Sequence, residues 1–228
     1  MESLQILGIQ LNAEMYRIIN LTMRLAFFST FISSLIGIPV GMLIEKKDFF
    51  LKKTLVRINR ALMGFPPVVA GLIVYLILMR NGPLGDLELL FTLEAMIIAQ
   101  TMIITPITIG MMYNACEKKA LRIRTFAKSM GANHFQTFKL LLKEMKADIY
   151  FIIITAFGRS VSEVGAVMIA GGNIQGKTRT MTTAISLMRN RGNFEEAISL
   201  GVILIIISFS VQLVADFFRK ESHEYEND

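Results

Sequence analysis

Charged residues are missing from long stretches of this chain. Four segments, residues 25–44, 61–79, 95–116 and 197–215, contain no Asp, Glu, Lys or Arg, and only two charges interrupt residues 149–169. A helix of about 20 residues crosses the roughly 30 Å hydrocarbon core of a membrane. With 53% hydrophobic residues and a mean hydropathy of +0.53, the chain is too apolar for an ordinary soluble domain. The sequence therefore predicts an all-α, polytopic membrane protein with five core transmembrane helices.

Three regions follow from this pattern. Residues 1–24 carry Glu2, Glu14, Arg17 and Arg24 among apolar side chains, which predicts a helix lying at the membrane interface. Residues 25–218 form the transmembrane domain. Residues 219–228 form a polar tail, predicted to be disordered.

The basic residues set the orientation. Residues 45–60 carry six of them, residues 117–148 carry eight, and Arg219 and Lys220 follow the last span, which gives sixteen on one side against seven on the other. Loops rich in Lys and Arg stay in the cytoplasm. We expect a multi-pass protein of the cell (inner) membrane with its N-terminus outside and its C-terminus in the cytoplasm. A net charge of +6 placed in such loops predicts no nucleic-acid binding.

The second basic loop has helical periodicity on both sides of Gly131. Phe135, Phe138, Leu142 and Met145 recur at steps of three and four, so they share one helix face. Gly131 is suited to a left-handed helix end, and Asn133 to the cap of the next helix. We expect two short helices with a sharp corner, a shape suited to docking a soluble partner.

Polar residues inside the spans are candidates for a pathway. Thr101 and Thr105 lie in the third span, where such density of polar groups indicates a face toward protein or water. Arg159 and Glu163 lie four residues apart in the fourth span, so on a helix they share a face and can pair. They are either a gate element or an ion pair that ties the span to its neighbours, and the structural interpretation weighs more. The Pro66–Pro67 pair predicts a local break in the second span.

The segment after the fourth span is rich in small and hydroxylated residues and contains no acidic residue between Val164 and Phe194. Lys177 and Arg179 lie among them. Such a lining offers donors to a hydrated tetrahedral anion. Close helix packing explains the same glycines and threonines equally well. The candidates are Gly171, Gly172, Asn173, Thr178, Thr180, Thr182 and Thr183, and residues 180–188 are expected to form a short helix dipping in from the outer face.

The sequence lacks the residues needed for ATP binding, for a metal site and for a catalytic triad. No phosphate-binding G-x-x-x-x-G-K-[ST] motif occurs, so the chain is not expected to bind ATP. Two histidines and one cysteine, far apart in sequence, predict no metal site and no catalytic triad. The chain is not expected to be an enzyme or to hold a cofactor. Three classes remain: a permease subunit driven by a separate ATPase, a self-contained channel or secondary carrier, and a scaffold.

The basic loop resembles the coupling loop of inner-membrane permeases of ATP-binding-cassette (ABC) importers, which reads E-A-A, three residues, G, nine residues, I-x-L-P. Gly131 matches the glycine, and residues 125–127 stand at E-A-A with only Ala127 the same. Leu141 stands at the isoleucine, and Lys143 and Glu144 stand at L-P. The resemblance implies the type I (MetI-like) importer fold. It also implies that the ATPase docks on Ala127, Gly131, Ala132, Asn133, Phe135 and Phe138.

A second stretch narrows the resemblance. Residues 158–185, G-R-S-V-S-E-V-G-A-V-M-I-A-G-G-N-I-Q-G-K-T-R-T-M-T-T-A-I, resemble the oxyanion branch of these permeases and are most similar to tungstate permeases. This implies a homodimer with a central pathway, two ATP-binding subunits that hold ATP and Mg²⁺, and an extracytoplasmic tungstate-binding protein. Molybdate, sulfate or phosphate is the alternative substrate.

Overall fold

A computed structural model describes residues 13–46 and 50–227 of the chain, with side chains through residue 218. The described part is helical, as predicted. Its elements are α2 (Ala13–Lys46), α3 (Lys52–Met63), α4 (Pro67–Leu78), the 3₁₀ turn η1 (Gly85–Leu87), α5 (Leu93–Ser129), α6 (His134–Glu144), α7 (Lys146–Val161), α8 (Gly165–Gly171), α9 (Met181–Asn190) and α10 (Phe194–Asn227).

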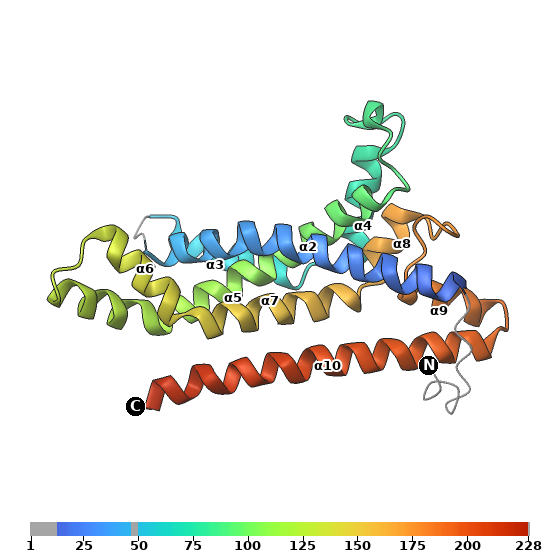
Figure 1. Cartoon of the computed structure of the whole chain (residues 1–228). Helices are drawn as coiled ribbons and strands as arrows, with labels where there is room; N and C mark the ends of the chain where they lie inside the picture. Colours follow the sequence, from blue (N-terminus) through green and yellow to red (C-terminus); the bar gives the residue numbers. More distant parts are fainter. Residues whose placement is uncertain (1–12, 47–49, 228) are drawn as a thin grey trace.

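The long helices α2, α5, α7 and α10 run along a common direction (Figure 1). The corner between α5 and α6 lies at one end of this bundle, called here the α6 end, and α9 lies at the other, the α9 end. Helix α4 projects sideways from the bundle near the α9 end, together with the turn η1.

Within residues 13–46 and 50–227, three helices are long and apolar enough to cross a membrane: α2, α5 and α10. Two further pairs pass the same test together but are bent, α3 with α4 by 97° and α7 with α8 by 60°. Counting each bent pair as one span gives the five predicted spans. The proline pair does break the second span, since α3 ends at Met63 and α4 starts at Pro67.

Helix boundaries differ from the expectations in three places. Residues 13–24 are continuous with the first span in α2, and residues 1–12 lie outside the described part. The segment before Gly131 is the end of the 37-residue helix α5, so the corner joins one long and one short helix rather than two short ones. The backbone of residues 219–227 is helical, which differs from the predicted disorder.

Small residues let α2 and α5 approach closely. A Cβ added to Gly41 would lie 2.8 Å from the carbonyl oxygen of Ile109, and one added to Gly37 would lie closer still to the side chain of Thr108. Small residues at such contacts are typical of membrane helix pairs, which associate by packing rather than by the hydrophobic effect. Helix α10 is the opposite case: only 11% of its most apolar stretch is buried. A helix this apolar and this exposed presents its surface to lipid or to another chain.

Candidate translocation and coupling sites

The bend between α7 and α8 is built around the carboxylate of Glu163. Its Oε1 accepts hydrogen bonds from the backbone N–H groups of Val164 and Gly165, both at 3.1 Å. Its Oε2 lies 3.2 Å from Nη2 of Arg159. The predicted ion pair is therefore present, but the predicted continuous helix is not. The carboxylate satisfies N–H groups that the broken helix leaves without carbonyl partners.

A buried polar cluster supports this bend from behind. The Nε2 atom of Gln100 on α5 donates to the carbonyl oxygen of Ser160, close to the end of α7. Ser29 on α2 lies within hydrogen-bonding distance of Gln100 Oε1, at 3.3 Å, and of Ser160 Oγ, at 2.9 Å. All three residues are buried. This cluster was not predicted from the sequence, although Ser29 and Gln100, polar residues inside uncharged runs, were its visible signal.

Arg159 faces outward from the bend. Its side chain is 42% exposed, whereas that of Glu163 is 5% exposed. Ser162 and Val164 are exposed beside it. Because only one guanidinium nitrogen of Arg159, Nη2, is paired with Glu163, the side chain presents further N–H donors on the protomer surface within a membrane-spanning segment.

The two bent spans meet through their short halves. Helix α4 packs against α8, and glycines on both sides allow the contact: a Cβ on Gly71 would lie 2.7 Å from Cα of Ala166, and one on Gly165 would lie 2.8 Å from Cγ2 of Val68. The side chains of Val68, Val69, Leu72 and Leu76 on α4 remain exposed. The α4–α8 unit thus carries an apolar surface next to Arg159.

The hydroxyl-rich segment near the α9 end is folded on itself. Thr182 Oγ1 donates to the carbonyl oxygen of Glu163, at 2.8 Å, so it joins α9 to the bend. Thr180 and Thr183 form a reciprocal capping box at the start of α9, and Thr178 bonds backbone atoms of Gly171 and Ile174. These hydroxyls are buried, so within this protomer they serve packing and capping. The sequence left this interpretation open beside that of an anion-binding lining. The predicted short helix is present as α9.

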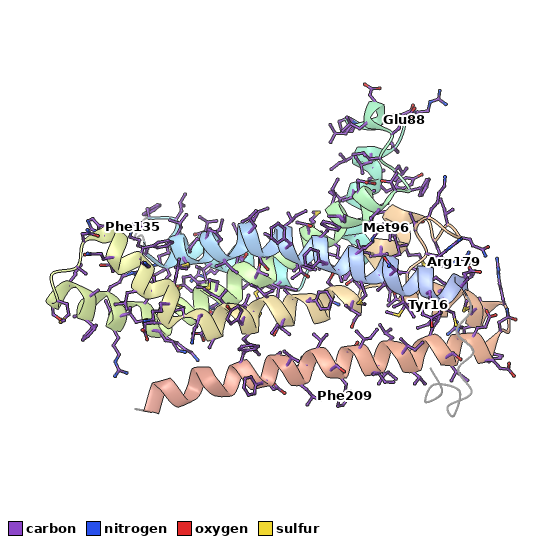
Figure 2. All side chains as sticks on the ribbon, in the orientation of Figure 1. Tyr16, Glu88, Met96, Phe135, Arg179 and Phe209 are labelled. Carbon is purple, nitrogen blue, oxygen red and sulfur yellow. The ribbon has the colours of Figure 1, made fainter. Side chains whose placement is uncertain are left out.

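The other candidate residues at the end of α8 and after it have structural roles that differ from one another. Gly171 is buried against Met96 of α5, and Gly172 and Asn173 adopt positive φ angles of 68° and 51° at the end of α8. Arg179 is only 8% exposed and pairs with Glu14 of α2 at 3.0 Å, so it ties the loop to the bundle and does not offer an open positive charge. Figure 2 shows Arg179 at the α9 end.

Thr101 and Thr105 lie where α2 and α5 pack. Thr105 Oγ1 donates to the carbonyl oxygen of Thr101, at 2.7 Å, and contacts Ser33 Oγ at 3.4 Å. The hydroxyl of Thr101 is buried and has no hydrogen-bond partner among the described residues. The structure does not bring these two threonines together with Arg159 by any hydrogen bond within the described part of the chain.

The corner at the α6 end has the local geometry that the sequence indicates. Gly131 has φ = 72°, in the left-handed region. Asn133 caps α6 in a reciprocal box with Gln136. Phe135 is 75% exposed and Phe138 is 50% exposed, which is unusual for large aromatic side chains outside an interface. Figure 2 shows Phe135 at the end of the molecule opposite Arg179.

The other two candidates of the corner lie behind this surface. Ala127 is buried on the last turns of α5, and Ala132 is partly buried between Gly131 and Asn133. They shape the corner rather than present contacts. In residues 13–46 and 50–218 no three acidic, histidine or cysteine side chains gather in a way that could hold a metal ion.

Residues 37–221 match the family model described as the binding-protein-dependent transport system inner membrane component. The chain is 37% identical over 213 residues, 93% of each chain, to the tungstate uptake system permease protein TupB of Peptoclostridium acidaminophilum. It is 37% identical over 193 residues to a probable anion ABC transporter permease protein of Haloferax volcanii, covering 82% of this chain and 83% of that one.

Among solved structures, the fold is similar to a chain of the inward-facing MetNI methionine ABC transporter. The TM-score is 0.72, with 19% sequence identity, and the match covers 91% of this chain and 95% of the other. This confirms the type I importer fold. The family model covers most of the chain, including both bends and the corner at Gly131. The chain therefore belongs to the inner-membrane permease components of binding-protein-dependent ABC transporters, and it is not itself an enzyme.

Proposed function

We propose that this chain is the permease subunit of an ABC importer for tungstate. The observation that carries the proposal is its 37% identity, over 93% of both chains, with a tungstate uptake permease. A self-contained channel or carrier is no longer an attractive alternative, because the family depends on a binding protein. Molybdate or another oxyanion, such as sulfate or phosphate, is the second candidate, and the relative named only as an anion permease supports keeping it.

The proposed assembly is a homodimer with its pathway between the two copies. Two ATP-binding subunits, which carry ATP and Mg²⁺, dock at the α6 end in the cytoplasm on Phe135 and Phe138 at the Gly131 corner. An extracytoplasmic binding protein delivers the anion at the α9 end. This places the N-terminus outside and the C-terminus in the cytoplasm. The exposed aromatic residues and the sixteen-to-seven distribution of basic residues support this arrangement.

Within the pathway, Arg159 is the side chain that meets the anion. It is exposed at the bend of a membrane span, and Glu163 holds it in place without covering it. A cation inside a membrane-spanning segment is costly unless it faces water or a partner charge. Glu163 supplies a partner charge, and the exposed 42% of the Arg159 side chain favours a position that faces the water of the pathway. Thr182, through the carbonyl oxygen of Glu163, connects this position to α9.

The test is ATP-dependent uptake in proteoliposomes that contain this chain, its ATPase and its binding protein. We expect tungstate to accumulate and to raise the ATPase rate, whereas an amino acid or a metal cation does neither. Competition by molybdate, sulfate and phosphate measures the selectivity. Stimulation by a ligand other than an oxyanion only would remove the substrate assignment while leaving the family intact.

Arg159 is tested in the same vesicles. We expect Arg159→Gln to lower tungstate uptake on the order of tenfold, and Arg159→Lys to retain more of it because the charge remains. Arg80→Gln, which removes an exposed cation from the loop after α4, serves as the matched control. Equal uptake by the wild type and Arg159→Gln would show that the anion does not depend on this side chain.

A further inference from the structure

A groove of about 850 Å³ opens between the last turns of α2, the end of α5, and α6. Its floor is apolar: Ile38, Pro39, Met42 and Leu43 come from α2, and Leu141 and Leu142 come from α6. Its rim carries Lys46, Arg124 and Lys128, and no acidic side chain lines it. The groove is therefore apolar at its floor and positively charged at its rim.

Two of the rim cations have no anionic partner among the described residues. Arg124 is paired with Glu45, at 2.6 Å between Nη2 and Oε2. Lys46 and Lys128 are exposed, and neither forms an ion pair with any acidic residue of the described parts, 13–46 and 50–218. An anionic group that entered the groove would meet two lysines that form no ion pair with the described acidic residues.

The order of these residues along α2 matches the depth profile of a membrane. The floor residues Ile38 and Leu43 belong to the uncharged run of residues 25–44, which spans the hydrocarbon, and Lys46 lies just beyond its end. Lys and Arg at this level meet lipid headgroups, and basic pockets between helices bind anionic ones. The part of the floor that α2 forms lies at hydrocarbon depth, which a soluble protein does not reach, whereas Leu141 and Leu142 belong to the cytoplasmic loop.

From these observations we propose that the groove binds one anionic membrane phospholipid, with its phosphate between Lys46 and Lys128 and an acyl chain along the floor formed by α2. Phe135, the most exposed aromatic residue of the corner, does not line the groove. Phe138, the second aromatic residue proposed to meet the ATPase, does line the groove. A lipid there would therefore contact Phe138 and brace α6 against α2, while Phe135 stays available to the ATPase.

The test counts lipids bound to the purified, full-length permease by native mass spectrometry, with phosphatidylglycerol or phosphatidylcholine supplied in detergent. We expect phosphatidylglycerol to be retained in preference. Each lysine near an anionic headgroup contributes a factor of about five in affinity, so the double variant Lys46→Gln/Lys128→Gln should bind it on the order of 30-fold more weakly. Phosphatidylcholine binding should not change.

The matched control is Lys118→Gln/Lys139→Gln, which removes two exposed lysines from the same end of the molecule but outside the groove. It should bind phosphatidylglycerol within about twofold of the wild type, because the net charge is the same as in the test variant. Equal losses in both double variants, or no preference of the wild type for the anionic lipid, would overturn the proposal. Equal competition by glycerol phosphate, which has no acyl chains, would assign the site to a soluble anion instead.

Two further measurements distinguish a loss of the lipid site from misfolding of the variant. Size-exclusion chromatography establishes that the test variant elutes as the wild type does, so that lost binding is not misfolding. A Leu43→Asp variant places a negative charge on the floor and should also lower retention of phosphatidylglycerol while both lysines remain. If Leu43→Asp retains lipid as the wild type does, the acyl chain does not lie on α2 and the proposal fails. A folded wild type that retains no phospholipid would indicate that another surface covers the groove, which also contradicts it.

Discussion

Two membrane spans are bent in this protein, and they are bent for different reasons. Between α3 and α4 the cause is local: Pro66 is extended, with ψ = 123°, and Pro67 occupies the first turn of α4. Neither cap of this bend makes a side-chain hydrogen bond. Between α7 and α8 no proline occurs, and the bend depends on Glu163, Gln100, Ser29 and Thr182, which come from four different helices or loops.

The bend between α3 and α4 is therefore fixed by the backbone conformation of its prolines. The bend between α7 and α8 is fixed by polar contacts, which can exchange partners. The short halves of both spans nevertheless pack on each other, with Gly71 against Ala166. We therefore expect substitutions at the polar bend to have larger effects than substitutions at the proline bend. Four predictions test this difference.

The largest effect is expected for Glu163→Ala. It leaves two backbone N–H groups without their acceptor and removes the partner of Arg159, which should lower the free energy of unfolding by about 3 kcal/mol or more. Glu163→Gln keeps one oxygen for the N–H groups and should lose less. The measurement is the fraction of monodisperse permease that survives a temperature ramp in detergent. Unchanged stability in both variants would mean that the carboxylate does not hold the bend.

Gln100→Leu comes next. It removes the donor to the carbonyl oxygen of Ser160 and the acceptor for Ser29, both buried, and should cost about 2 kcal/mol. Thr101→Val, on the next residue of α5, is the control because the hydroxyl of Thr101 has no partner among the described residues. The same heating assay should separate the two variants. If they are equally stable, the cluster behind the bend contributes no more than an unbonded hydroxyl.

Gly71→Ala tests the contact that joins the two bends. Its new Cβ would lie 2.7 Å from Cα of Ala166, so α4 and α8 must separate, at a cost of about 1 to 2 kcal/mol. Gly201→Ala, in α10, meets no atom within 4 Å and should be neutral or slightly stabilising. We expect ATP-dependent uptake to fall in the first variant only. Equal uptake in the two variants would indicate that the α4–α8 contact adapts without consequence.

The smallest effect is expected for Pro67→Ala. An N–H in the first turn of a helix lacks an intrahelical partner in any case, so the change should alter the free energy of unfolding by about 1 kcal/mol or less. Thermal survival in detergent, measured beside Glu163→Ala, provides the comparison. A loss as large as that of Glu163→Ala would remove the distinction between the two bends.

The sequence predicted those features whose cause is local. Uncharged runs gave the spans, Pro66 and Pro67 gave the first bend, and Gly131 and Asn133 gave the corner at the α6 end, because each depends on the conformational preferences of one or two residues. It did not predict the α7–α8 bend as a break. The residues that hold this bend are brought together from positions 29, 100, 160 and 182, and no pattern of neighbouring residues encodes such pairings. Arg179 was misread for the same reason, since its partner Glu14 lies 165 positions away.

The length of α5 has a mechanical consequence. Its 37 residues form one continuous helix of about 55 Å, with Pro106 in its interior, that reaches from the α9 end, beside α8, to the glycine corner. Near its midpoint it is clasped by Gly37 and Gly41 of α2, where the backbones touch. A helix held at its centre pivots about that contact. Because each half of α5 is about 28 Å long, a tilt of about 10° moves its two ends by about 5 Å in opposite directions. A push on the corner at one membrane surface would thus displace the N-terminal end of α5, which the side chain of Thr92 caps, at the other surface, without any helix having to unfold.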